Sequence, residues 1–204
     1  MKNITTLVAD IHSVLNTSKI DPELIDEFTT NLNGLLKHRF SGEAEKPSLR
    51  MSNFGKPNRQ LWYSINKPEL GEPLRPEVRL KFLYGDLVEQ IMLLLIKASG
   101  HTVTGTQDEL NLNGLKGHRD AIVDGVLVDV KSASSYAFDK FAYHTLGKDD
   151  AFGYIDQLSL YLTASQDDVD VKKQAAFVAV NKENGKIVVD TYSLEKKDYT
   201  KELT

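Results

Sequence analysis

The sequence of 204 residues contains no cysteine. Disulfide bonds, zinc sites with cysteine ligands, iron–sulphur clusters and thiol nucleophiles are therefore excluded. Long apolar segments are also missing, because the longest run, Ile91–Ile96, is far shorter than the ~20 residues that span a bilayer. The N-terminal residues lack the apolar centre of a signal peptide, so we expect a cytoplasmic protein without a membrane partner.

Neither sign of charge dominates, because 25 basic residues stand against 29 acidic ones and the net charge is −4. The charge is nevertheless unevenly distributed. Between Lys46 and Lys81 there are eight basic and three acidic residues, and the same stretch contains the only tryptophan, Trp62, beside Tyr63. Basic side chains interleaved with aromatic ones suit a phosphate backbone and stacked bases. A solvated loop whose Trp62 and Tyr63 enter the core explains the pattern equally well.

Hydrophobic periodicity predicts two helices at the N-terminus, one over residues 4–16 and one that begins at Pro22 with Asp21 as its N-cap. Residues 41–80 are rich in proline, and we expect mostly loop there with a short helix near residues 59–63.

From residue 78 the pattern predicts a long helix (78–99), several short strands, an irregular stretch (133–150), a helix (151–164) and a last hairpin. Asn113-Gly114 and Asp124-Gly125 are strong signals for two-residue hairpin loops. The β-type runs are residues 101–106, 109–113, 118–123, 126–132, 174–181 and 186–192. This order predicts an α/β fold with a mixed sheet flanked by helices.

The turn at Asp124-Gly125 sets the register of the strands on either side of it. If these two residues form the loop, Asp120 faces Asp129 and His118 faces Lys131 on one face of the hairpin, opposite an apolar face. Two facing carboxylates repel each other unless a cation lies between them. Oxygen ligands of this kind favour Mg²⁺ or Mn²⁺ over zinc. Alternatively, Lys131 and His118 simply neutralise the aspartates in a surface ion cluster.

An ordered set of segments resembles the core of the PD-(D/E)xK nucleases, in their RecB-like and phage-exonuclease branch. The resemblance covers roughly residues 50–182, including residues 50–63, which are similar to the segment that precedes this core in phage and CRISPR-associated relatives. Iron–sulphur members of the branch carry a cysteine near Pro57 or Asn58, so a cluster is excluded here. The matching motif residues are Glu89 in the long helix, Asp120 after Gly117, Asp129 with Lys131, and Gln157 with Tyr161.

The resemblance implies a restriction-endonuclease-like αβββαβ core and metal-dependent hydrolysis of phosphodiester bonds in DNA, with two Mg²⁺ or Mn²⁺ ions. Lys131 would orient the nucleophilic water, and its partial burial would make it a better base. Gln157 and Tyr161 would position Lys131 or a phosphate, unless they only pack their helix. The implied metal ligands are Glu89, Asp120, Asp129 and the Val130 carbonyl; for Glu89 a plain helix-surface carboxylate is the alternative.

Candidate contacts with DNA extend beyond the metal ligands. The irregular stretch 133–150 could be a flap over the nucleic acid, or it could hide a short helix whose aromatic residues belong to the core. The candidate nucleic-acid-binding residues are Arg50, Ser52, Arg59, Trp62, His118 and Ser132.

We expect a single nuclease domain over residues 1–204, with an N-terminal helical extension (1–45), the core region (46–182) and a C-terminal strand and tail (183–204). The resemblance favours a phage-type exonuclease of DNA recombination, repair or degradation. We expect it in the cytoplasm of a bacterium or phage-infected cell, with a single-strand-binding or recombination protein as a further partner. An endonuclease or junction resolvase of the same fold and a non-catalytic nucleic-acid-binding module are the alternatives. The complete set of four charged motif residues argues against the last of these. The sequence leaves the oligomeric state open.

Overall fold

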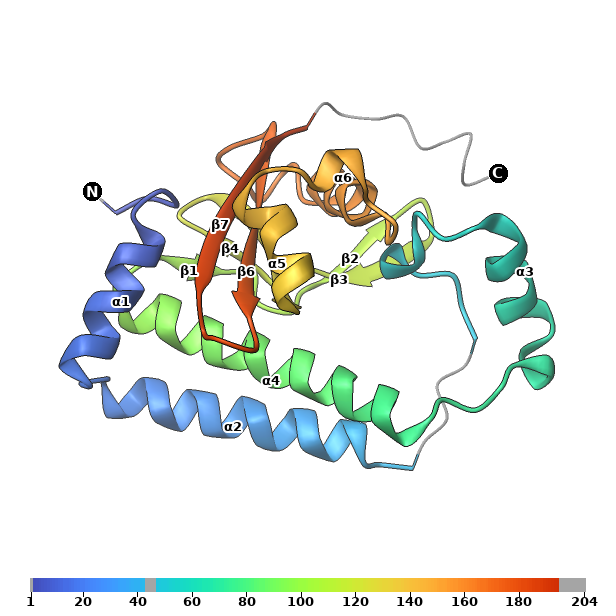
Figure 1. Ribbon diagram of the computed structural model, residues 1–204, viewed down its shortest axis with the longest axis horizontal. Coiled ribbons are helices and arrows are strands. Elements are labelled where there is room, and N and C mark those ends of the chain that lie inside the picture. The colour runs from blue at the N-terminus through green and yellow to red at the C-terminus, as the bar shows by residue number, and fades with distance from the viewer. Residues whose placement is uncertain (1, 43–46, 195–204) are drawn as a thin grey trace.

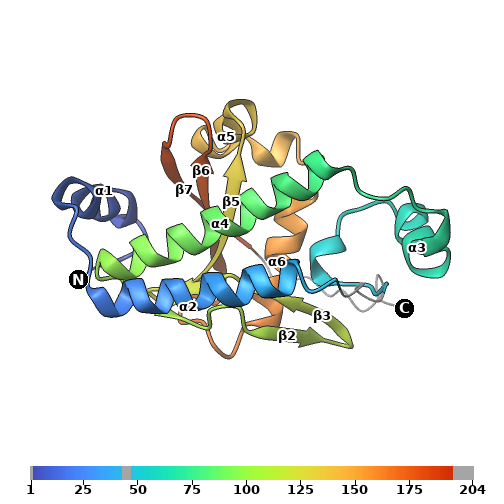
Figure 2. The ribbon, with the colours of Figure 1, turned by 90° about the horizontal axis from the view of Figure 1, so that it is seen from below.

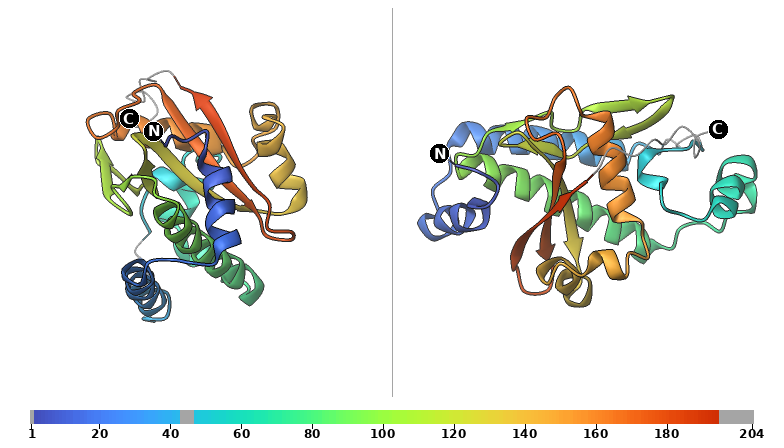
Figure 3. Two further views of the ribbon diagram at one scale, coloured as in Figure 1. Left: turned by 90° about the vertical axis from the view of Figure 1, so that its left-hand side faces the viewer. Right: turned by 90° about the horizontal axis from the view of Figure 1, so that it is seen from above.

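The computed structural model describes residues 2–42 and 47–194, so the predicted tail beyond residue 194 and Lys46 lie outside the described residues. It is an α/β structure, in which helices cover both faces of a mixed five-stranded sheet (Figures 1 and 3). None of the helices in the described ranges is both long enough and apolar enough to cross a membrane.

The two N-terminal helices form where the periodicity predicts them. Helix α1 spans Leu7–Thr17, and α2 spans Pro22–Arg39 with Asp21 as the N-cap, whose side chain accepts a hydrogen bond from the Glu23 N–H at 3.0 Å. The long helix α4 (Pro76–Ala98) also matches its prediction. Figures 1 and 2 both show α2 lying along α4, away from the sheet. Helix α4 therefore lies between α2 and the sheet, and α1 also packs against it.

The central sheet has the strand order β1-β4-β5-β6-β7. Strands β5 and β6 are parallel, and the other neighbouring pairs are antiparallel. A separate ribbon is formed by β2 (Glu109–Leu112) and β3 (Leu115–His118), which pair across Asn113-Gly114 as predicted. The strands of the central sheet are β1 (Val103–Thr104), β4 (Ala121–Val123), β5 (Val126–Ala133), β6 (Gln174–Asn181) and β7 (Ile187–Ser193).

The predicted hairpin turn at Asp124-Gly125 is confirmed. Both residues have positive φ angles, 49° and 79°, as a two-residue loop of this kind requires. Val123 pairs with Val126 and Ala121 with Val128, so the predicted register holds within the ladder. One face of this hairpin packs beneath α1 and α4, and its buried residues are Ala121, Val123, Val126, Val128 and Val130. Asp129 and Lys131 consequently point to the opposite face, toward helix α6 (Tyr154–Ala164).

The prediction of one continuous strand over residues 118–123 was wrong. Strand β3 ends at His118 and β4 begins at Ala121, because Arg119 is buried and draws the chain away from the sheet. The Arg119 guanidinium lies 2.6 Å from an Asp108 carboxylate oxygen and 2.7 Å from one of Asp168, and its Nε donates to the Gly105 carbonyl. The ladder of the β4–β5 hairpin therefore stops at Ala121.

The stretch 133–150 is not irregular, and the alternative of a hidden helix is confirmed. Helix α5 covers Ser135–Ala142, followed by a 3₁₀ turn over Leu146–Lys148. Phe138 and Phe141 are buried in the core beneath this helix. The segment is therefore packed on the body through its two phenylalanines, whereas Tyr136 and Tyr143 are exposed, so only part of its aromatic residues belongs to the core.

The proline-rich stretch contains the short helix α3 (Asn58–Asn66), between the 3₁₀ turns Met51–Asn53 and Pro68–Leu70. Helix α3 projects from the body of the molecule at the end opposite α1 (Figures 1 and 2). Trp62 is 53% exposed and Tyr63 42% exposed. The interpretation that these two rings enter the core is therefore wrong.

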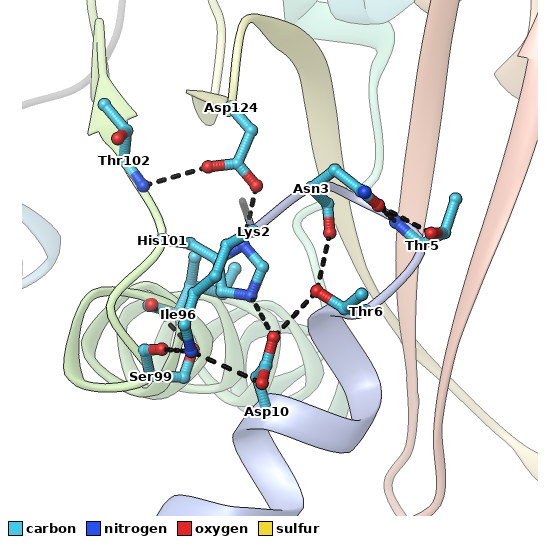
Figure 4. A network of polar contacts seen from close by, with 10 residues as sticks. All are labelled: Lys2, Asn3, Thr5, Thr6, Asp10, Ile96, Ser99, His101, Thr102 and Asp124. Atoms are coloured by element: carbon cyan, nitrogen blue, oxygen red, sulfur yellow. Dashed lines mark hydrogen bonds and ion pairs between the residues drawn. The ribbon is translucent and has the colours of Figure 1, made fainter.

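A buried polar network attaches the N-terminus to the β4–β5 turn (Figure 4). The His101 side chain is fully buried, with Nδ1 2.6 Å from Asp124 Oδ2 and Nε2 3.1 Å from Asp10 Oδ2. Lys2 pairs with Asp10 at 3.3 Å. His101 thus joins α1, the end of α4 and the hairpin turn.

We predict that His101→Ala lowers the free energy of unfolding by about 2 kcal/mol or more, because it leaves two partly buried carboxylates without their shared donor. Urea unfolding followed by circular dichroism measures this change. His12→Ala, at an exposed position of α1, is the matched control and should unfold like the wild type. Equal stability of the His101 variant would show that the network contributes nothing.

Candidate functional site

Three carboxylates converge where α4 passes the start of β4 and the middle of β5. Asp129 lies on β5, Asp120 lies directly before β4, and Glu89 lies on α4. Although Asp120 and Asp129 are not ladder partners, Asp120 Oδ2 accepts a hydrogen bond from the Val130 N–H at 2.7 Å. The bend at Arg119 thus leaves Asp120 attached to β5 through its side chain. The predicted juxtaposition of the two aspartates is present, although the strand pairing that predicted it is not.

The electrostatics shows that ionisation of two of these carboxyl groups, Asp120 and Glu89, is disfavoured. Burial, followed by the charges of Asp129 and Glu89, raises the pKa of Asp120 well above its ordinary value. Burial, followed by the charges of Asp129 and Asp86, raises the pKa of Glu89 to about 7, although a hydrogen bond from Gln107 opposes this. Glu89 is therefore part of the acidic cluster, and the interpretation of it as a plain surface carboxylate is wrong.

Lys131 is the cation of the cluster. Its Nζ lies 2.5 Å from Asp129 Oδ2 and 4.9 Å from the centre of the Tyr154 ring. Burial lowers the pKa of Lys131, but the combined attraction of Asp129 and Asp120 outweighs burial and holds the pKa above its ordinary value. Without a further cation beside the carboxylates, Lys131 is thus held protonated, contrary to the expectation that its burial makes it a base.

The donor set fits a hard divalent cation. Asp129 Oδ2 is a buried carboxylate oxygen that already lies against one cation, the Lys131 ammonium. The N–H and C=O of one residue in an extended strand point the same way. Because the Val130 N–H faces Asp120, the Val130 carbonyl is a further oxygen on the side of β5 where Asp120 lies. Carboxylate and carbonyl oxygens are the ligands that Mg²⁺ and Mn²⁺ prefer. Within residues 2–42 and 47–194, no three acidic or histidine side chains are close enough to enclose an ion as they stand.

Gln107 is a site residue that the sequence did not reveal. Its side-chain amide donates to Glu89 Oε1, and its backbone N–H donates to the Asp120 carbonyl at 3.3 Å. It therefore connects α4 with the residue before β4. Its φ of 58° lies in the left-handed region, where glutamine is uncommon. No periodicity or motif marks such a loop contact.

Tyr154 is a second residue that the sequence did not reveal. Together with Phe177 on β6, whose ring centre is 6.0 Å from Lys131 Nζ, it forms an aromatic floor beneath the ammonium group. Tyr154 lies three residues before Gln157 on the same helix, a spacing that could have indicated a shared face.

The two predicted residues of α6 have different roles. Gln157 donates from Nε2 to the carbonyls of Phe54 and Phe152, each at 3.1 Å, so it holds the segment around residue 54 against α6 and does not contact Lys131. Tyr161 is buried, and burial, followed by the charges of Asp129 and Asp120, raises its pKa. Only Tyr161 therefore borders the acidic cluster.

The predicted nucleic-acid contacts do not form one surface. His118 is exposed and pairs with Glu109 in the β2–β3 ribbon, so the prediction that it faces Lys131 was wrong. Arg50 and His118 line a cavity of about 1030 Å³ between α2, α4 and this ribbon, and Glu89 lies in its wall. Ser52 is exposed in the 3₁₀ turn after Arg50. Arg59 and Trp62 lie on the projecting helix α3, and Ser132 lies on β5 on the face opposite Lys131.

Comparison with known proteins gives little further information. No family model matches the chain, and no curated protein matches it. Among solved structures, one described as "Crystal structure of SSO0001" is 18% identical, with 84% of this chain and 80% of that chain covered and a TM-score of 0.43. A likeness at this level carries no argument about fold or function. Any assignment of function therefore rests on the geometry of the site described above.

We predict that Asp120→Asn stabilises the protein in EDTA, because it removes one of three repelling charges while its amide oxygen can still accept from the Val130 N–H. A gain of about 1 kcal/mol corresponds to a rise in Tm of ~2–4 °C for a chain of this length. Thermal unfolding in EDTA measures it, with Asp167→Asn, at an exposed position, as the control. A marked fall in Tm would instead place Asp120 in a structural ion network.

Proposed function

We propose that this protein is a metal-dependent nuclease that hydrolyses phosphodiester bonds in DNA. The observation that carries the proposal is the half-buried cluster of Glu89, Asp120 and Asp129, in which negative charges raise the pKa of Glu89 and of Asp120, with Lys131 against one oxygen of Asp129. Carboxylates that share a site and raise one another's pKa occur preferentially at functional sites. The motif resemblance to PD-(D/E)xK nucleases supports the same chemistry from the sequence.

The residues have separable roles in this proposal. Glu89, Asp120, Asp129 and the Val130 carbonyl would hold Mg²⁺ or Mn²⁺. The bound ions would supply stabilisation of negative charge on the attacking and leaving oxygens of the phosphodiester. Lys131 would bind the scissile phosphate or the attacking water, because its ammonium is held in place by Asp129 and the Tyr154 ring.

Within this class, the resemblance of the motifs to the RecB-like and phage-exonuclease branch favours an exonuclease of DNA recombination, repair or degradation. An endonuclease would use the same cluster, since one fold supports several modes of cleavage. End-labelled linear DNA and closed circular DNA, incubated separately with the protein, distinguish the two: an exonuclease releases the label and leaves the circle intact.

We predict that cleavage requires Mg²⁺ or Mn²⁺ and stops in EDTA. Ca²⁺ should occupy the site with little turnover, because its looser coordination aligns the reacting groups poorly. Release of labelled nucleotides is measured after exhaustive removal of metal and again after each ion is restored. Full activity in EDTA would contradict the assignment of the carboxylates as metal ligands.

We predict that Lys131→Ala lowers the cleavage rate roughly 10²-fold or more, while metal binding persists. Lys131→Arg should not restore activity, because the guanidinium is larger and planar. Turnover with Mg²⁺ is compared with DNA affinity in Ca²⁺, which should fall only modestly for one lost phosphate contact. Lys148→Ala, at an exposed position, is the control. Cleavage by Lys131→Ala at the wild-type rate would remove Lys131 from the mechanism, and a wild type that binds DNA without cutting it would indicate a binding module.

A further inference from the structure

Helix α3 presents one continuous aromatic and basic face to solvent. Arg59, Trp62, Tyr63 and Asn66 follow the spacing i, i+3, i+4, i+7 and so lie on one face of the helix. The Arg59 guanidinium lies 5.8 Å from the centre of the Tyr63 ring, and the Trp62 and Tyr63 rings meet edge to face at 5.1 Å. These contacts hold the two rings next to each other without covering them.

The opposite face of α3 carries aliphatic residues. Leu61 and Ile65 lie on it and are half-buried, whereas Trp62 and Tyr63 remain exposed. The helix therefore shelters its aliphatic residues more than its largest aromatic residues, which remain in water. Exposing a tryptophan next to a tyrosine forgoes the burial of a large apolar surface, and such a patch marks an interaction site.

The surroundings of α3 are positively charged. We define the basic arm as residues 56–84, which comprise α3, the 3₁₀ turn after it and the first turns of α4. It contains six basic and three acidic residues in a protein whose net charge is −4. The basic side chains are all exposed, and they are Lys56, Arg59, Lys67, Arg75, Arg79 and Lys81. Two further exposed aromatic residues of the arm, Phe82 and Tyr84, lie on α4.

We infer that the basic arm binds single-stranded nucleic acid, with unpaired bases stacked on Trp62 and Tyr63 and the phosphates near Arg59 and its basic neighbours. The charge of the arm is complementary to a phosphate backbone and disfavours a basic partner. The exposed ring faces select unpaired bases, because the bases of a duplex are already stacked on one another. This inference deepens the proposed nuclease function, on which its biological meaning rests, by naming the strand type that the enzyme would hold.

The sole tryptophan makes the inference directly measurable. Titration of the wild-type protein in EDTA with oligothymidylate of about 20 nucleotides should quench the fluorescence of Trp62, since a stacked base lies against the indole. A duplex of the same length should quench it far less. The affinity for the single strand should fall with salt concentration, because phosphate contacts release counterions.

A matched pair of variants tests the role of the exposed ring. Trp62→Ala should weaken binding of a labelled oligothymidylate about tenfold, as measured by fluorescence anisotropy in EDTA. Tyr143→Ala removes a ring that is 74% exposed outside the arm and should bind like the wild type. Circular dichroism of both variants verifies that they are folded.

The outcomes separate this inference from the proposed nuclease activity. Tenfold weaker binding by Trp62→Ala in a protein that cuts no DNA would support the arm and contradict the nuclease. If the protein cuts DNA and Trp62→Ala binds the oligonucleotide as tightly as the wild type, the nuclease would be supported and the role of the arm contradicted. Equal quenching by duplex and single strand would also overturn the inference, as would a blue shift of Trp62 emission that depends on protein concentration alone, since the face would then bind a second copy of the chain.

Discussion

The repulsion among three half-buried carboxylates is the constraint around which this structure is arranged. The charge of Asp129 raises the pKa of both Glu89 and Asp120, Glu89 adds to the effect on Asp120, and burial is the largest contribution to both shifts. The fold compensates with Lys131 and with hydrogen bonds to single oxygens, from Gln107 to Glu89 and from the Val130 N–H to Asp120. Lys131 lies against one oxygen of Asp129, but it supplies a single positive charge against three carboxyl groups. A divalent cation would relieve the remaining charge, and we therefore propose a metal site here in preference to a structural ion cluster.

Two buried ionic networks hold the strands that carry these acids. Arg119 fixes the chain directly before Asp120 by pairing with Asp108 and Asp168. At the other end of the short strand β4, Asp124 is held by His101 (Figure 4). Because both ends of β4 are anchored, Asp120 can be kept beside Asp129 against their repulsion. Rigid support of this kind is what a preorganised site requires.

Local signals made much of the fold predictable, whereas contacts distant in sequence did not. The register of the β4–β5 hairpin follows from its two-residue turn, and the apolar face followed from alternation alone. The break at Arg119 could not be predicted, because it depends on Asp168, which lies 49 residues further along the chain. Gln107 reaches Glu89 only through a loop conformation that no pattern encodes. In contrast, Phe138 and Phe141 already carried the spacing of a helix in the stretch that was interpreted as irregular.

Direct binding of Mn²⁺ tests the central claim that Glu89, Asp120 and Asp129 form a cation site. Isothermal titration calorimetry on the metal-free protein measures it without any substrate. We expect Mn²⁺ to bind the wild type and to bind Asp129→Asn at least tenfold more weakly, which is a loss of about 1.4 kcal/mol in binding free energy. The exposed control Asp167→Asn should bind Mn²⁺ like the wild type. Absence of binding to the wild type, or equal binding by Asp129→Asn, would contradict the account.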